Sequence, residues 1–314
     1  MYRENTIALT AMALNEERLI RPTLESVPDF VDHVYFVDDG STDDTLEIAR
    51  DIAKQDPRIE VIPHGTNLGV GQSIITGYER SAADGNDITV VVGGDNQMPM
   101  EQIVDLLDPI IDGEADYTKG NRFLMPNEGL ADMPWTRMLP NLLISFLTKI
   151  ASGYYKIFDV VDGFTAISKR AIDLIDWDAA WTRYGYPMDF LIRLNAYGFR
   201  VKDVPRRAIY LAGERQSQIK GFPYAIKNSY MLVRGFFWRL LTRYLFRDFH
   251  PLLFFYFFGL LLLPLGVGMG CYLQYQQWAG IGVSGPRAVL CALMILMGIQ
   301  FLLFAVLYDM EESR

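Results

Sequence analysis

Two oxygen-bearing side chains stand two residues apart, shortly after an apolar run in the first third of the chain. Ile88–Val92 is followed by two glycines and then by Asp95 and Gln97. Such side chains at a strand end can reach one point, and Mg²⁺ and Mn²⁺ prefer carboxylate and amide oxygens. The glycines permit close approach of a ligand to the backbone. The pattern predicts a cation site, and the alternative is an ordinary Gly-Asp-Asn turn.

A pair of carboxylates follows another apolar run closer to the N-terminus. Asp38 and Asp39 come directly after His33–Val37 and precede a Gly-Ser-Thr turn. Ionised carboxylates accept hydrogen bonds, here from a ribose or from a base N–H, and they repel a phosphate. A phosphate-binding glycine loop is therefore excluded. The alternative is that these residues only cap the following helix, with Ser41 or Thr42 as the cap.

These side chains need a sheet to position them, and residues 1–120 predict one. Apolar runs that predict strands alternate with helical patterns, which indicates parallel strands joined by crossover helices. Ligands of such sheets gather at the carboxyl ends of the strands, where both acidic segments fall. The predicted strands are Thr6–Ala11, His33–Val37, Ile59–Ile62, Ile88–Val92 and Ala115–Lys119, and the predicted helices are Glu16–Ser26, Thr42–Lys54, Gly69–Ala83 and Met100–Ile111.

The composition excludes several other classes of protein. Half of the 314 residues are apolar, which excludes a disordered chain. Two cysteines exclude a disulfide scaffold and a cysteine zinc site, and three scattered histidines do not form a His-rich metal motif. Residues 1–120 carry 24 acidic and 8 basic side chains, whereas residues 121–314 carry 14 acidic and 21 basic ones. The two parts therefore have different tasks, and no nucleic-acid partner is predicted.

Two long uncharged segments near the C-terminus predict membrane-spanning helices. Leu252–Leu273 has 22 residues and Ala288–Tyr308 has 21. About 20 apolar residues suffice to cross a bilayer. The short loop between the segments predicts a hairpin whose two ends lie on the same side of the membrane. No secretory signal is predicted, because Met1–Asn5 is polar and the next apolar stretch is short.

A basic stretch precedes the first predicted span. Its arginines are Arg234, Arg239, Arg243 and Arg247, whereas the loop of the hairpin carries only Arg287. Positive charge favours the cytoplasm, so we expect a two-span protein of the cell membrane with a cytoplasmic main domain. Residues 222–248 have an amphipathic pattern that predicts helices lying on anionic headgroups. The alternative is a packed helix with a solvated basic face.

The order and spacing of the motifs along the chain resemble those of a family 2 glycosyltransferase with the GT-A fold. The likeness is closest to the polyprenyl-phosphate glycosyltransferases, a group that includes dolichol-phosphate mannose and glucose synthases. It extends over essentially the whole chain, including the two predicted spans. The motifs are Leu14-Asn15-Glu16-Glu17, Val37-Asp38-Asp39-Gly40-Ser41, Asn67-Leu68-Gly69, Asp95-Asn96-Gln97-Met98-Pro99, Lys119-Gly120-Asn121-Arg122-Phe123, Asp162-Gly163-Phe164 and Val204-Pro205.

The resemblance implies a donor site at the first four strand ends. The residues that it assigns to nucleoside binding are Ala11, Ala13, Asn15, Glu16, Asp38 and Asp39. Asp95 and Gln97 match the metal positions of the family, and the implied cofactor is Mg²⁺ or Mn²⁺. The chain departs from the family at Gly93, where the family has the first Asp of an Asp-x-Asp-x-Gln motif, and at Met12, where it has proline.

The resemblance also implies a site for the acceptor phosphate. Its residues are Arg122, Arg137, Asn141 and Arg215, with Asn141 in place of a serine. Asp189 falls where many family 2 enzymes have a catalytic base, and the implied catalytic set is Asp95, Arg122, Asp189 and Arg215. A lipid phosphate is largely ionised at pH 7 and needs no base. Asp189 could instead hydrogen-bond the donor sugar or the acceptor pocket, or cap a helix that begins at Phe190.

The implied architecture is an α/β domain of the GT-A type, with a Rossmann-like, mostly parallel sheet flanked by helices. We expect this domain over residues 1–221, amphipathic juxtamembrane helices over 222–248, and the hairpin over 249–314 with spans at about 252–273 and 288–308. Packing of the spans between subunits would give a homo-oligomer.

The implied activity is inverting, metal-dependent hexose transfer from a nucleoside diphosphate sugar, UDP- or GDP-linked, to a polyprenyl phosphate at the cytoplasmic membrane face. Two alternatives remain at this point. The acceptor could be a lipid-linked saccharide or diacylglycerol, with Asp189 as the base. The chain could also be a non-catalytic, sugar-nucleotide-binding subunit of a glycosylation complex, because the carboxylate expected at Gly93 is missing.

Overall fold

A computed structural model describes residues 1–125, 135–209, 221–247 and 249–312, with the side chains of 135–141 and 221–227 excepted. The chain forms two compact units, Met1–Phe236 and Phe237–Arg314.

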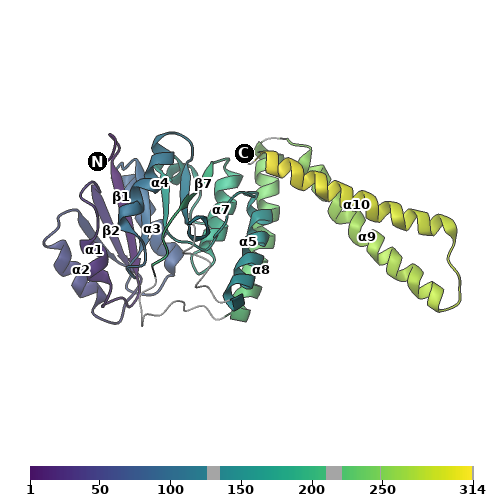
Figure 1. The fold of residues 1–314 in the computed structure, drawn as a ribbon, viewed down its shortest axis with the longest axis horizontal. Coiled ribbons are helices and arrows are strands. Elements are labelled where there is room, and N and C mark those ends of the chain that lie inside the picture. Colours follow the sequence, from purple (N-terminus) through teal and green to yellow (C-terminus); the bar gives the residue numbers. More distant parts are fainter. Residues whose placement is uncertain (126–134, 210–220, 248, 313–314) are drawn as a thin grey trace. The chain divides into compact units, whose positions relative to one another are not determined.

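A seven-stranded sheet forms the centre of the first unit (Figure 1). The strands are β1 (Ile7–Ala13), β2 (His33–Asp38), β3 (Ile59–Pro63), β4 (Ile88–Gly93), β5 (Tyr117–Asn121), β6 (Thr165–Ser168) and β7 (Val201–Pro205). Their order across the sheet is β3-β2-β1-β4-β6-β5-β7. Strand β6 is antiparallel to both of its neighbours, whereas the other pairs are parallel. The sheet is therefore mostly parallel, as expected.

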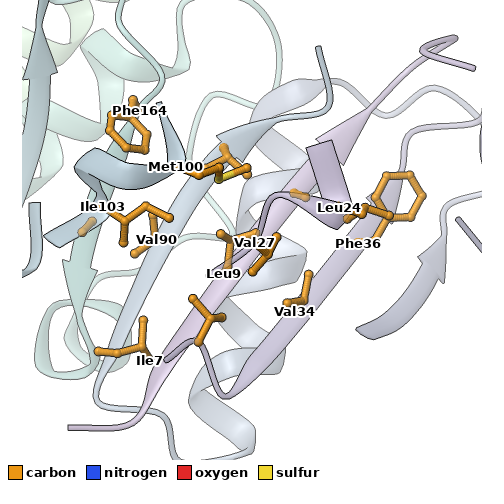
Figure 2. Packing of buried hydrophobic residues seen from close by; sticks show 14 of the residues in the cluster. Ile7, Leu9, Leu24, Val27, Val34, Phe36, Val90, Met100, Ile103 and Phe164 are labelled. Carbon is orange, nitrogen blue, oxygen red and sulfur yellow. The ribbon is translucent and has the colours of Figure 1, made fainter. Parts of the chain in front are cut away.

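Helices cover both faces of the sheet because alternate side chains of each strand point to opposite faces. The helices of this unit are α1 (Ile20–Glu25), α2 (Thr45–Ala53), α3 (Val70–Ala83), η1 (Met100–Gln102), α4 (Ile103–Ile111), η2 (Arg122–Leu124), α5 (Trp135–Ser152), α6 (Lys169–Leu174), α7 (Tyr186–Ala196) and α8, which runs from Gly221 to Leu241. One face packs on α1, α2 and α4, and Figure 2 shows its core, in which Leu9, Phe36 and Val90 are fully buried. The opposite face packs on α3, whose Gly77 lies directly against Thr10.

The structure confirms the strands and helices predicted for residues 1–120, with shifted ends. The largest shift is in α1, because the residues before Ile20 form a turn in which the Glu16 N–H donates to Thr45 Oγ1 (2.8 Å). The suggestion that Ser41 or Thr42 caps the next helix is wrong. Helix α2 begins at Thr45 with Asp44 as its N-cap, and it is Asp43 Oδ1 that accepts from the Thr45 N–H (3.1 Å).

The second unit contains two long apolar helices, α9 (Leu252–Trp278) and α10 (Gly285–Glu312), that pack on each other. Both are long and apolar enough to cross a membrane. Seven of the ten buried positions repeat every seven residues: Leu252, Gly259, Gly266 and Leu273 on α9, and Cys291, Gly298 and Ala305 on α10. A seven-residue repeat of small and apolar residues is typical of closely packed helices in a bilayer. The glycines allow that packing, since a Cβ at Gly298 would lie 2.7 Å from the Leu263 nitrogen.

One predicted headgroup contact is wrong. Arg239, expected on the exposed basic face of a juxtamembrane helix, is completely buried. Its guanidinium donates to both carboxylate oxygens of Asp309 (2.8 and 2.7 Å), and Tyr244 and Tyr256 donate to the same carboxylate. The spacing of the arginines along the helix could not reveal this partner, which lies 70 residues later in the chain. Arg247, by contrast, is exposed, and Arg243 is partly exposed and donates from Nη2 to the Glu312 backbone oxygen (3.0 Å).

Candidate active site

A cleft of 330 Å³ lies at the carboxyl ends of β1 and β4 in the first unit. It is lined by Met12, Ala13, Leu14, Glu16, Asp39, Asn67, Gly69, Val70, Ser73, Gly93, Gly94, Asp95, Met98, Gly163, Arg183, Tyr184 and Tyr186. The strands that carry both predicted acidic segments are paired through β1, so Asp39 and Asp95 meet at one cleft although 56 residues separate them. This is the location expected for ligands of a parallel sheet.

Asp95 occupies a tight turn after β4. Its Oδ1 accepts a hydrogen bond from the Gln97 N–H (3.2 Å), and Asn96 has the left-handed φ of +53° that turns the chain. Gly94 must lack a side chain, because a Cβ there would lie 2.8 Å from Ala13 Cβ. Burial raises the pKa of Asp95 above its ordinary value, although the backbone hydrogen bonds and the charge of Arg206 act in the opposite direction. A buried carboxylate of this kind gains from a cation beside it.

The chemistry of the two predicted ligands suits a divalent cation, although only Asp95 is among the described residues that line the cleft. Asp95 supplies a carboxylate and Gln97 an amide oxygen, both ligand types suited to Mg²⁺ or Mn²⁺. Within the described ranges of the chain, no group of three or more His, Cys, Asp or Glu side chains is placed to hold a metal. A cation held by Asp95 and Gln97 would therefore need further ligands from outside these two residues.

Gly93 takes the position of the carboxylate that the family motif leads one to expect. A Cβ at this position would lie 3.0 Å from Asp95 Oδ1, which is a tight contact. The glycine thus leaves room for the Asp95 carboxylate to fold back over the strand end. The position of the Asp95 carboxylate therefore depends on the absence of a side chain at residue 93.

The two neighbouring carboxylates after β2 have different surroundings. Asp39 accepts hydrogen bonds from the backbone N–H groups of Leu68 and Gly69 (2.9 to 3.1 Å), and His64 Nδ1 lies 3.2 Å away. Asp38 is 1% exposed, and its Oδ2 accepts from the Ser41 N–H (3.1 Å). Its Oδ1 is buried and has no hydrogen-bond partner among the described residues.

The remaining residues assigned to the nucleoside fall into two groups. Ala13 and Glu16 line the cleft. Asn15 supports it from outside, because its Oδ1 accepts from the Thr42 N–H (2.8 Å) and its N–H donates to Ser41 Oγ. Ala11 is buried in the core of the sheet and does not line the cleft.

A buried network of charges lies beside the cleft, at the ends of β5 and β7. Arg122 donates from Nε and Nη2 to the two oxygens of Asp159 (both 2.7 Å). Arg206 donates to Asp162 (2.6 Å) and, through Nη1, to the backbone oxygen of Gln97 (3.1 Å). Lys119 is 1% exposed and donates to the backbone oxygen of Asp159. The arginine assigned to the acceptor phosphate is thus already held in a fixed orientation.

Asp159 and Arg206 were not predicted from the sequence, in which Asp162 stands only as part of the Asp162-Gly163-Phe164 motif. Burial alone would raise the pKa of Asp159, but the hydrogen bonds from Arg122 and the positive charges of Arg122 and Lys119 outweigh it. The pKa of Asp159 therefore lies below its usual value of 3.8. The carboxylate remains ionised throughout the neutral range and acts as a fixed counter-ion.

Replacing Asp159 with asparagine is expected to lower the free energy of unfolding at pH 7 by about 3 kcal/mol, because Arg122 loses the buried carboxylate that accepts two of its hydrogen bonds. The native pKa is depressed, so the stabilisation is present above pH 3.8 and is lost as the pH falls through the native value. The difference in melting temperature between wild type and Asp159→Asn should therefore narrow below pH 3.8. Tryptophan fluorescence during heating would measure it in detergent.

The exposed Asp51, which pairs with Lys54, provides the control for Asp159. Asp51→Asn should have little effect at either pH, because an exposed pair contributes little. A pH-independent difference for Asp159→Asn would contradict the electrostatic role of Asp159.

Asp189 lies within a helix rather than before one. Helix α7 begins at Tyr186 with Gly185 as its N-cap, so the proposed helix start at Phe190 and a capping role for Asp189 are wrong. Asp189 is 8% exposed, and its Oδ2 accepts from the Trp181 N–H (2.9 Å) and from Arg193 Nε (2.8 Å). It is not among the described residues that line the cleft.

Three of the assigned acceptor residues cannot be placed at side-chain level. Arg137 and Asn141 lie on α5, but their side chains are outside the described part of the chain. Arg215 lies outside the described residues altogether. The side chains of Leu142, Leu143, Phe146 and Leu147, which follow on α5, are 39–60% exposed. This helix thus presents an apolar surface next to Arg137 and Asn141 in the sequence.

Comparison with known proteins gives consistent matches. The profile of glycosyl transferase family 2 matches residues 12–175. The UDP-N-acetylglucosamine–dolichyl-phosphate N-acetylglucosaminyltransferase of Methanococcus voltae is 30% identical over 220 residues, which cover 66% of this chain and 87% of that protein. The polyprenol monophosphomannose synthase of Mycolicibacterium smegmatis is 29% identical over 181 residues, which cover 55% and 65%.

A solved structure supports the fold. Residues 1–349 of S. aureus TarS, crystallised with UDP-GlcNAc, align with a TM-score of 0.53 over 98% of this chain and 89% of that one, at 16% identity.

Proposed function

The chain belongs to glycosyl transferase family 2 and is a glycosyltransferase, and we propose that it transfers a hexose from a nucleoside diphosphate sugar to a polyprenyl phosphate at the cytoplasmic membrane face. The observation that carries the proposal is that Asp39 and Asp95 line the same cleft, in a chain that also has two candidate membrane spans. Relatives named for dolichyl-phosphate and polyprenol products support the acceptor class.

The donor nucleotide would bind along β1 and β2. Asp39 and Glu16 line the cleft and can accept hydrogen bonds from a ribose or a base N–H, with Ala13 as the floor and Asn15 and Asp38 shaping the loop. Asp95 and Gln97 would hold Mg²⁺ or Mn²⁺ against the diphosphate. When bound, the cation would neutralise the negative charge that develops on the leaving diphosphate.

Transfer would proceed with inversion at the anomeric carbon. A phosphate oxygen of the acceptor attacks from the face opposite the diphosphate, the new carbon–oxygen bond forms, and the bond to the diphosphate breaks with its electron pair. Arg122, Arg137, Asn141 and Arg215 would hold the acceptor phosphate, since a guanidinium fork matches phosphate oxygens. Fixed positive charge beside two anionic reactants lowers their repulsion without reorganisation during the reaction.

The membrane would hold the lipid tail of the polyprenyl phosphate acceptor. The two spans would anchor the chain, and the exposed leucines and phenylalanine of α5 would lie at the lipid surface near the phosphate site. Arg247 is exposed and Arg243 is partly exposed, and both would favour the cytoplasmic side, whereas Arg239 is paired with Asp309 and takes no part. The basic half of the sequence is then the half that meets phosphate and membrane.

A transfer assay tests this function. The purified protein in detergent receives a short polyprenyl phosphate, Mg²⁺ or Mn²⁺, and radiolabelled UDP-N-acetylglucosamine, UDP-glucose or GDP-mannose in separate reactions. We expect one donor to send label into the organic phase, and chelator to prevent it. Parallel reactions use diacylglycerol and a lipid-linked disaccharide as acceptors.

The outcomes separate the candidate functions. Label in the diacylglycerol or disaccharide reaction alone would replace the phosphate acceptor with a hydroxyl one. Donor binding without transfer to any of the three acceptors would favour a non-catalytic subunit. Proton NMR of a labelled phosphate product would report the configuration at the anomeric carbon, and retention of configuration would contradict the inverting mechanism.

A further inference from the structure

The segment from Asp176 to Gly185 is held by one ion pair on helix α7. Asp189 Oδ2 accepts from the Trp181 N–H (2.9 Å) and from Arg193 Nε (2.8 Å). Arg193 also donates from Nη1 to the Asp176 oxygen (2.9 Å) and from Nη2 to the Ala179 oxygen. The pair is nearly buried, with the two residues 8% and 7% exposed. Three hydrogen bonds thus join the Asp189–Arg193 pair to the backbone of the segment, at Asp176, Ala179 and Trp181. A fourth joins the two side chains to each other.

The same segment packs against the amino end of α3. The Thr182 oxygen accepts from the Gly71 and Gln72 N–H groups (2.8 and 3.2 Å). These are donors that the first turn of a helix cannot satisfy by itself. The contact requires glycine at residue 71, because a Cβ there would lie 2.6 Å from the Trp181 oxygen.

This packing also determines which residues line the cleft. Arg183 and Tyr184 follow Thr182 directly and line the cleft together with Gly69 and Val70 of the amino end of α3. Arg183 donates to the side-chain oxygen of Asn67 (3.2 Å), a third residue of the cleft. One wall of the cleft is therefore built by a segment that has no regular secondary structure of its own and is held by Asp189 and Arg193.

We propose that Asp189 is a positioning residue that, paired with Arg193, fixes the segment 176–185 so that Arg183 and Tyr184 form one wall of the donor-sugar site. The proposal rests on the proposed function, since it takes the cleft to hold the nucleotide sugar. Asp189 lies behind the wall and directs Oδ2 to two N–H donors. This geometry suits an ionised acceptor of hydrogen bonds, whereas a base must reach the proton that it removes.

Three variants test the proposal by independent routes. Asp189→Asn weakens the pair, Arg193→Gln removes the guanidinium without touching Asp189, and Gly71→Ala leaves the pair intact but pushes on the Trp181 oxygen. Alanine suits a helix better than glycine, so a loss caused by Gly71→Ala cannot come from helix propensity. The control is Asp173→Asn, which breaks the exposed i,i+4 pair of Asp173 with Lys169.

The measurements are the dissociation constant of the donor, KM, kcat and the pH profile. The donor is whichever of UDP-N-acetylglucosamine and GDP-mannose the wild-type protein binds more tightly, and its binding is measured by calorimetry without acceptor. All three variants should raise its dissociation constant and KM by about tenfold, the cost of losing one or two well-formed contacts. They should keep kcat within about threefold and leave the pH profile unchanged. Asp173→Asn should match wild type.

Other outcomes overturn the proposal. A fall of about a hundredfold or more in kcat for Asp189→Asn alone, with unchanged donor binding and a lost acidic limb of the pH profile, would make Asp189 a base. Unchanged donor binding in Gly71→Ala and Arg193→Gln would show that the segment does not shape the site. Because donor binding is measured without acceptor, it still tests the wall if wild type fails to transfer to polyprenyl phosphate. Gly71→Ala keeps the test open if the Asp189 variant does not fold.

Discussion

Asp95→Ala is expected to reduce transfer to polyprenyl phosphate by about a hundredfold to a thousandfold, the loss seen when one main source of transition-state charge stabilisation is removed. Asp95 is the carboxylate that meets Asp39 at the cleft, and it lies at the end of a strand where the turn is too tight for a side chain at residue 94. Without it, Gln97 alone would remain to hold the cation. The transfer assay with saturating donor and Mg²⁺ or Mn²⁺ measures the loss.

Two further variants define the cause of that loss. Asp95→Asn keeps the size of the side chain and removes its charge, so it should lose nearly as much activity as Asp95→Ala. Asp105→Ala removes an exposed carboxylate ten residues later on α4 and should retain wild-type activity. Thermal unfolding should show that all three variants fold. Activity above about a tenth of wild type in Asp95→Ala, or activity that chelator does not affect, would remove Asp95 from the metal site.

Asp309→Ala is expected to destabilise the second unit by about 3–5 kcal/mol, the usual cost of removing one partner from a buried ion pair. Asp309 is completely buried and accepts hydrogen bonds from Arg239, Tyr244 and Tyr256. The substitution leaves the Arg239 charge buried without its carboxylate. Burial alone would lower the pKa of Arg239, but the charge and the hydrogen bonds of Asp309 outweigh burial. The pKa of Arg239 therefore lies above its ordinary value. The melting temperature in detergent would report the loss.

A matched control and a double substitution test this explanation. Glu311→Ala removes an exposed carboxylate two residues further along the same helix and should leave the melting temperature unchanged. Arg239→Met combined with Asp309→Leu removes both charges, and apolar side chains of similar size often replace a buried pair without loss. Most of the stability should therefore return. If the double substitution is as unstable as Asp309→Ala, packing rather than the unpaired charge explains the effect.

The local patterns of residues 1–120 were enough to predict the first part of the fold. Strands β1 to β4 and helices α2 to α4 follow from runs of apolar residues with period two or 3.6, which depend only on neighbours in the chain. Strand β6 is different. Thr165–Ser168 has four residues and carries little pattern of its own, and it pairs with β4 and β5 because the fold brings them to either side. Its antiparallel insertion between β4 and β5 depends on tertiary contacts and not on its own sequence.

The candidate site divides in the same way. Asp39 and Asp95 could be singled out because each directly follows a strand pattern, and parallel strands bring their carboxyl ends to one edge. Asp159 and Arg206 could not, since each is an ordinary charged residue until the fold pairs Asp159 with Arg122 and Arg206 with Asp162. The resemblance supplied Arg122, but only the structure showed that Asp159 already orients it.

The sequence by itself determined the α/β class, the family, the two candidate spans and the meeting of Asp39 and Asp95 at the cleft, because these follow from local periodicity and from motifs of fixed spacing. Only the tertiary structure decided which charges are buried and with whom. Arg239 has the spacing of a surface arginine but pairs with Asp309. Asp189 falls at the position where many members of the family have a base, but its carboxylate accepts a hydrogen bond from the backbone N–H of Trp181. The reason is physical: a charge leaves water only where the fold delivers a partner, and that partner can lie anywhere in the chain.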